Sequence, residues 1–217
     1  MDLAQNGYVF SVHNDSSFEG GINFSGGAIT YQSFVGSHWS RLADNSKPEI
    51  LLGTVMESIS TLCEWYEVEY EIDGTKEKEY LGLLPDGKNV GDNYTVTKDG
   101  VDYVGVIKKQ NNERLAQSKI SDTEDSKAVY GVFCGWDNDD DKVNDMNIAS
   151  LGAYIVRIHK DETLAIGDYL QSKGDGTAKK QADDILRSST IAKVTSTTKT
   201  VTYDDGSYCV PCTLHCG

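Results

Sequence analysis

Short runs of alternating polar and apolar residues, separated by turn-forming dipeptides, constrain this chain more than any other feature. The run Trp65–Ile72 places glutamates on either side of Tyr66 and Val68, so a strand there has one apolar and one acidic face. Asp73-Gly74 follows directly, and Asp-Gly pairs favour tight hairpin connections. Alternation of this kind, repeated along the chain, predicts an all-β fold of short strands and hairpins.

The segments that we expect to be strands share this alternation or are rich in Val, Ile, Tyr and Thr. They are Tyr8–His13, Gly27–Gln32, Glu49–Ser58, Trp65–Ile72, Glu79–Leu84, Tyr94–Thr97, Val101–Lys108, Ala128–Trp136, Ala153–Ile158, Tyr169–Ser172, Ile191–Thr195, Thr198–Thr202 and Ser207–Leu214. Helical periodicity is confined to two short candidates, Glu113–Ser118 and Ala182–Arg187.

Composition divides the chain into three sections. Residues 1–32 are rich in Gly, Ser and Asn, and they predict an extended arm or shaft end, because such a segment buries little apolar surface alone. Residues 33–127 form a middle β-rich section. Residues 128–217 hold the densest apolar strands and predict a compact C-terminal β domain.

The charge balance argues against two classes of partner. The chain has 34 Asp and Glu against 20 Lys and Arg, a formal net charge of -14, which disfavours a protein that binds nucleic acid by neutralising phosphates. No run approaches the ~18 to 20 consecutive apolar residues of a membrane helix, so we expect no membrane insertion. The first ten residues also lack the basic and apolar regions of a secretory signal.

The cysteine-rich end YCVPCTLHCG suggests a zinc site, because Cys209 and Cys212 form a C-x-x-C with His215 and Cys216 close by. In a strand, however, side chains alternate between faces, so Cys209 and Cys212 point apart. A turn at Pro211 would bring them together. We favour buried thiols in a terminal strand over a metal site.

The segment Asp137–Asp145 places oxygen-bearing side chains at every second position, as calcium-binding loops do. Lys142 stands where such a loop needs glycine, and Ile148 stands where it needs glutamate. A solvated acidic hairpin loop is therefore favoured over a calcium site. We expect neither a metal nor a cofactor.

The segment Gly36–Arg41, GSHWSR, carries the most suggestive chemistry. Ser37 and Ser40 are candidate nucleophiles, His38 is a candidate base, and Arg41 is a candidate oxyanion partner. Because successive side chains diverge, we favour a structural turn carrying a buried tryptophan. The sequence contains neither a Gly-x-Ser-x-Gly elbow nor an H-E-x-x-H helix, and we expect no enzyme that acts on an external substrate.

Several segments, taken in order, resemble the C-terminal modules of phage and large-virus fibre or appendage proteins. They are GYVFSVHND, GGAITYQSFVGSHWSRL, EILLGTV, SKAVYGVFCGWDNDD, NDMNIASLGAYIVRI, IGDYLQSKGDGTAKKQADD, SSTIAKV and YCVPCTLHCG. Residues 59–112 align poorly. The nearest family by this resemblance is the intramolecular-chaperone, autoproteolytic domain of neck-appendage and tail-fibre proteins, the peptidase G2 type.

The resemblance implies a virion structural protein of a tail fibre or appendage. It implies a homotrimer with a chaperone-like C-terminal domain that contacts other virion tail or appendage proteins. It also implies self-cleavage within Gly36–Ser40, with Ser37 as nucleophile and His38 as base. The family's junction is similar to Gly-Ala-Asp-Tyr-Ala-Glu, whereas here His38 replaces the acidic residue and Arg41 replaces the glutamate.

A second hypothesis is a non-catalytic receptor-binding tip of a tail fibre. In that case exposed aromatic side chains, such as Trp39, Trp65 or Trp136, contact a glycan or protein on the host surface.

Overall fold

The computed structural model describes residues 7–14, 17–25, 28–32, 35–110, 112–137 and 142–215. Every regular element in these ranges is a β-strand, which confirms the predicted all-β class, and none is a helix that could span a membrane. The strands are β1 (Gly7–Asn14), β2 (Ser17–Ser25), β3 (Ala28–Gln32), β4 (Val35–Ser40), β5 (Val55–Leu62), β6 (Tyr66–Ile72), β7 (Thr75–Gly82), β8 (Asn93–Lys98), β9 (Val101–Lys109), β10 (Ala116–Ile120), β11 (Val129–Trp136), β12 (Met146–Ile158), β13 (Tyr169–Ser172), β14 (Ala178–Lys180), β15 (Ala192–Val194), β16 (Val201–Thr202) and β17 (Tyr208–His215).

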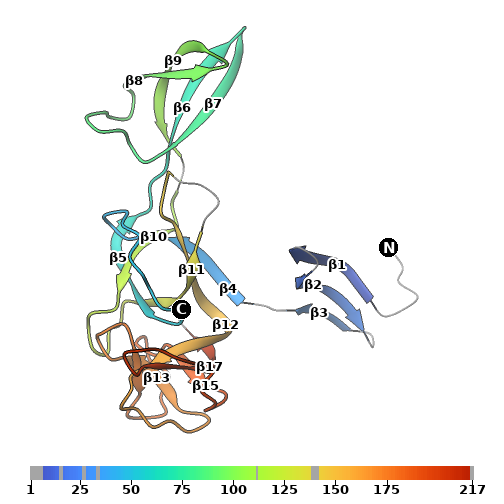
Figure 1. Cartoon of the computed structure of the whole chain (residues 1–217), viewed down its shortest axis with the longest axis vertical. Helices are drawn as coiled ribbons and strands as arrows, with labels where there is room; N and C mark the ends of the chain where they lie inside the picture. The colour runs from blue at the N-terminus through green and yellow to red at the C-terminus, as the bar shows by residue number, and fades with distance from the viewer. Residues whose placement is uncertain are drawn as a thin grey trace.

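Strands β1, β2 and β3 form an antiparallel sheet of their own, the arm sheet, which is set apart from the other strands (Figure 1). Phe10 pairs with Ile22 across the first two strands, and Val12 follows Phe10 on the same face. Phe10 is 58% exposed and Val12 is 46% exposed. The arm sheet of a single chain therefore presents an uncovered apolar surface.

The C-terminal strands close into a ring. β12, β14, β13, β15 and β17 pair in that order, and β17 pairs back onto the second half of β12 from Leu151 to Ile158. The ring is filled by fully buried side chains, including Ile158, Leu170, Ile191 and Leu214. Because the ring is closed, its strands have paired neighbours on both sides. Even the short strands therefore leave few backbone N–H and C=O groups unpaired.

The first half of β12 carries the remaining strands of this sheet. β11 and β4 pair with it on opposite edges, β5 pairs with β11, and β10 pairs with β5. Strands β4, β5 and β10 of the middle section thus belong to the same sheet as the C-terminal strands.

Strands β6 to β9 form a third sheet, the inserted sheet, in the order β7-β6-β9-β8 (Figure 1). The chain enters it from β5 and leaves it into β10, and these two strands pair with each other, as at Ser118 and Ser58. As the alternation in the sequence predicts, Tyr66 and Val68 are buried on one face while the glutamates of β6 lie on the other.

Both predicted helices are wrong. Residues 113–115 form a bend that leads into β10, and residues 182–187 form bends without helical hydrogen bonds. The polar helix formers of the first segment are extended because Ser118 pairs with β5 and its backbone N–H donates to the Arg41 carbonyl at 3.0 Å. Pairing with distant strands overrides local preference here. Strands β2, β4, β10 and β14 were not predicted, and of these β4 and β10 pair with strands that are distant in the sequence.

The cysteine-rich end is a strand, as predicted. Cys212 lies inside the ring core, where burial raises the pKa of its thiol to about 12. Cys209 lies on the other face, with its Sγ 3.4 Å from the Leu52 carbonyl. In the described ranges no three His, Cys, Asp or Glu side chains gather as a metal site would require, and Cys216 lies outside those ranges.

Candidate functional site

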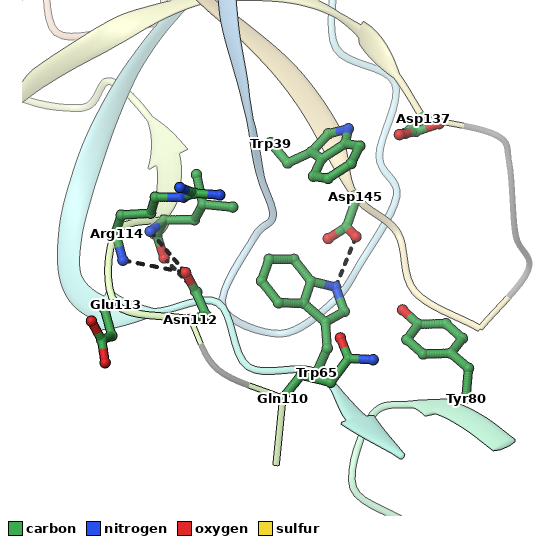
Figure 2. A pocket seen from close by; sticks show the side chains of 10 residues that line it. Trp39, Trp65, Tyr80, Gln110, Asn112, Glu113, Arg114, Asp137 and Asp145 are labelled. Atoms are coloured by element: carbon green, nitrogen blue, oxygen red, sulfur yellow. Dashed lines mark hydrogen bonds between the residues drawn. The ribbon is translucent and has the colours of Figure 1, made fainter. Parts of the chain in front are cut away.

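A cleft of about 830 Å³ lies where the inserted sheet meets the central strands. Two tryptophans and a tyrosine line it together with polar and charged side chains (Figure 2). The lining residues are Trp39, Trp65, Tyr80, Gln110, Asn112, Glu113, Arg114, Leu115, Asp137 and Asp145. They come from both sides of the insertion point, so the cleft forms only when the two sheets are assembled. Ligand sites are common at such junctions.

Trp39 provides the most accessible aromatic surface of the cleft. It lies on β4 opposite Asn147 of β12, and its side chain is 51% exposed. The prediction of a turn with a buried tryptophan in this segment is wrong. β4 is extended because it pairs with β12, and the alternation along the strand turns the indole outward.

Trp65 forms the base of the cleft. It is 9% exposed and packs against Cys63 and Val143. Its indole Nε1 donates a hydrogen bond to Asp145 Oδ2 at 2.9 Å, and the Arg41 guanidinium lies 5.5 Å from the ring centroid. This side chain therefore links the start of the inserted sheet to the residue just before β12.

The turn before β10 forms one rim and is held by Asn112. The Asn112 Oδ1 accepts hydrogen bonds from the backbone N–H groups of Arg114 and Leu115, at 3.3 and 3.1 Å. Its amide donates to the carbonyls of Cys63 and Leu115. With its polar groups used in this way, Asn112 fixes the turn while the side chains of Glu113 and Arg114 are exposed at the rim.

The hairpin between β11 and β12 forms the opposite rim. These strands are antiparallel, which confirms that the acidic segment connects a hairpin, and the Asp137 N–H donates to the Asp145 carbonyl at 2.9 Å. Residues 138–141 of the acidic segment lie outside the described residues. Asp137 and Asp145 add two carboxylates to the cleft.

The structure does not bring the predicted nucleophile and base together. Ser37 is exposed, whereas the neighbouring His38 is half-buried on the other face of β4, with its ring centroid 4.2 Å from that of Tyr130. Burial lowers the pKa of His38 below its usual value of 6.5, so its imidazole is neutral at pH 7. Its buried Nε2 has no hydrogen-bond partner among the described residues, Ser37 included.

The other members of the predicted catalytic segment have structural contacts. Ser40 is fully buried, and its hydroxyl lies 2.8 Å from both Ser118 Oγ and the Ala116 carbonyl. Arg41 is 5% exposed and donates to the Glu64 carbonyl at 2.7 Å. These contacts join β4 to β10 and to the segment just before β6. They hold together the elements that line the cleft.

Of the three tryptophans predicted to contact a receptor, two line the cleft and one does not. Trp136 packs on Phe133, with ring centroids 5.5 Å apart, beside the Lys47 ammonium. The polar rim was not predicted. Asp137 belongs to the acidic segment noted in the sequence, but Glu113 and Arg114 carry no motif, and the insertion of a sheet between two paired strands brings them to the cleft.

Comparison of the chain with protein-family models, with curated proteins and with solved structures gives no significant match.

Proposed function

We propose that this chain is a virion structural protein, a fibre or appendage module that binds a host surface receptor through the aromatic cleft. The observation that carries the binding role is the exposed face of Trp39 within a cleft of polar side chains. Exposed tryptophan is uncommon on a protein surface, and tryptophans at the centre of binding sites contribute most of the binding energy. The virion location rests on the resemblance of the sequence to fibre modules.

The arm sheet supports assembly of the module with copies of itself. Phe10 and Val12 are exposed on one face, and the outer edges of β1 and β3 pair with no described strand. An uncovered apolar face and open edges are stabilised by association. Three chains that pack these faces around one axis would form the end of a fibre shaft, as the family resemblance implies.

We predict that native mass spectrometry detects a complex of three full-length 23.8 kDa chains. Replacing both arm residues (Phe10→Ser with Val12→Ser) is expected to shift the complex to monomers, because it removes the apolar face. The matched control is Val101→Ser with Val104→Ser, which changes valines of β9 that are 51% and 67% exposed and should leave the trimer intact.

The same spectra test self-cleavage. We expect no fragments, because the bonds from Gly36 to Ser40 lie within a strand paired to β12, and Ser37 faces away from His38. Fragments that break in this segment and disappear in Ser37→Ala would restore the autoproteolytic function. A monomeric wild-type chain would contradict the trimer.

The binding role is tested by adherence of the labelled chain to intact microbial cells, with Trp39→Ala as the cleft variant. Leu151→Ala is the control, since Leu151 lies on β12 opposite Gly36 and is also exposed, at 55%, but does not line the cleft.

A further inference from the structure

Three charged side chains at the rim of the cleft have no side-chain partner within the described part of the protein. Glu113, Arg114 and Asp137 form no side-chain hydrogen bond or ion pair with any described residue. Most other charged groups near the junction are paired, as Lys109 is with Glu64 at 2.7 Å. The rim therefore offers two carboxylates as hydrogen-bond acceptors and one guanidinium as donor to a ligand in the cleft.

The combination of a flat aromatic surface with polar groups at its margin matches the chemistry of a sugar ring. A pyranose has an apolar face of C–H groups that packs on an indole, and hydroxyls at its edge that both donate and accept hydrogen bonds. Trp39 supplies the surface, with Arg114 on one side of it and Asp137 on the other (Figure 2). A purely apolar ligand would leave the charged rim groups desolvated without partners.

The charges of the cleft select against acidic ligands. Glu113, Asp137 and Asp145 outnumber the single cation Arg114, and the chain as a whole carries a formal charge of -14. A carboxylate or sulfate on the ligand would enter a field of its own sign.

We infer that the cleft binds an uncharged saccharide, with one pyranose ring stacked on Trp39 and hydroxyls along the saccharide hydrogen-bonded to the rim side chains Glu113, Arg114 and Asp137. This inference rests on the proposed receptor-binding function and names its ligand class.

The test is binding of the labelled full chain to a printed array of neutral, sialylated and sulfated glycans. We expect signal on neutral glycans only, at least about tenfold weaker for Trp39→Ala, which removes the stacking surface. Trp39→Phe keeps an aromatic ring and should retain most of the signal, and Leu151→Ala should retain all of it. Binding to acidic glycans alone, equal binding by Trp39→Ala, or no binding to any glycan would overturn the inference.

Removing the acidic rim tests the charge argument separately. The double variant Glu113→Gln with Asp137→Asn keeps hydrogen-bonding groups of the same shape but removes two negative charges. We expect it to bind sialylated glycans that the wild type rejects. If its glycan preference equals that of the wild type, the acidic rim does not select the ligand.

Adherence of the chain to cells treated with periodate or with protease distinguishes this inference from the proposed function. Adherence that is lost after periodate oxidation of cell-surface sugars and kept after protease treatment supports a saccharide ligand. Adherence that depends on Trp39 but is lost after protease and kept after periodate would overturn the saccharide inference and leave the receptor-binding function standing.

Discussion

Gly131→Ala is expected to lower the free energy of unfolding by about 3–5 kcal/mol, the sum of backbone strain and overpacking. Gly131 lies in β11 at a φ of +149°, next to the register shift between β11 and β5. A Cβ there would overlap the carbonyl oxygen of Ala149 and lie 2.6 Å from Ile148 Cγ2, both on the adjacent strand β12. Because these atoms belong to a central paired strand, they cannot move without separating the sheet.

Gly135→Ala is the matched control for this prediction. Gly135 is in the same strand at a φ of +145°, but an added Cβ would meet nothing within 4 Å. Only the backbone strain remains, so we expect a loss of about 1–3 kcal/mol. Urea denaturation followed by circular dichroism measures both variants. Equal losses would show that the close contact between β11 and β12 does not limit stability.

Trp65→Ala is expected to lower the free energy of unfolding by about 3–5 kcal/mol, as for other buried aromatic side chains. The indole fills the space between Cys63 and Val143, and its removal also leaves Asp145 Oδ2 without the donor Nε1. Trp65→Phe keeps most of the packing and loses this hydrogen bond, at a cost of about 1–3 kcal/mol.

The comparison with Trp39→Ala separates stability from binding. Trp39 is exposed, and its replacement should change the free energy of unfolding by less than about 1 kcal/mol, in the range of surface substitutions. Urea denaturation with circular dichroism measures all three tryptophan variants. If Trp39→Ala were as destabilising as Trp65→Ala, the exposed indole would stabilise the fold. That result would contradict a role for Trp39 in binding alone.

The strands with clear alternation could be predicted from the sequence because their two faces have different surroundings. Tyr66 and Val68 face a core while the intervening glutamates face solvent, and the period of two follows directly. β10 could not be predicted, because its conformation depends on β5, and the contact of Ser118 with Ser58 spans the whole inserted sheet. The residues of β10 alone do not indicate which distant strand pairs with them.

The candidate site was only partly predictable. Trp39, Trp65 and Trp136 were predicted as receptor contacts, and the first two line the cleft. The segment of Trp39 was predicted to be a turn, and the neighbouring Ser37 and His38 were given a catalytic interpretation. The rim residue Glu113 carries no motif, and Asp137 was predicted only as part of an acidic hairpin loop. They line one cleft from opposite rims, with Trp39 between Arg114 and Asp137 in the view of Figure 2.

Adherence of the labelled chain to a panel of intact microbial cells tests the central claim most directly, because it measures receptor binding by the assembled protein. We predict that cells of a host species retain the wild type and Leu151→Ala, and retain Trp39→Ala at least about tenfold less. Equal retention of wild type and Trp39→Ala, with both proteins folded and assembled alike, would contradict the assignment of receptor binding to the aromatic cleft.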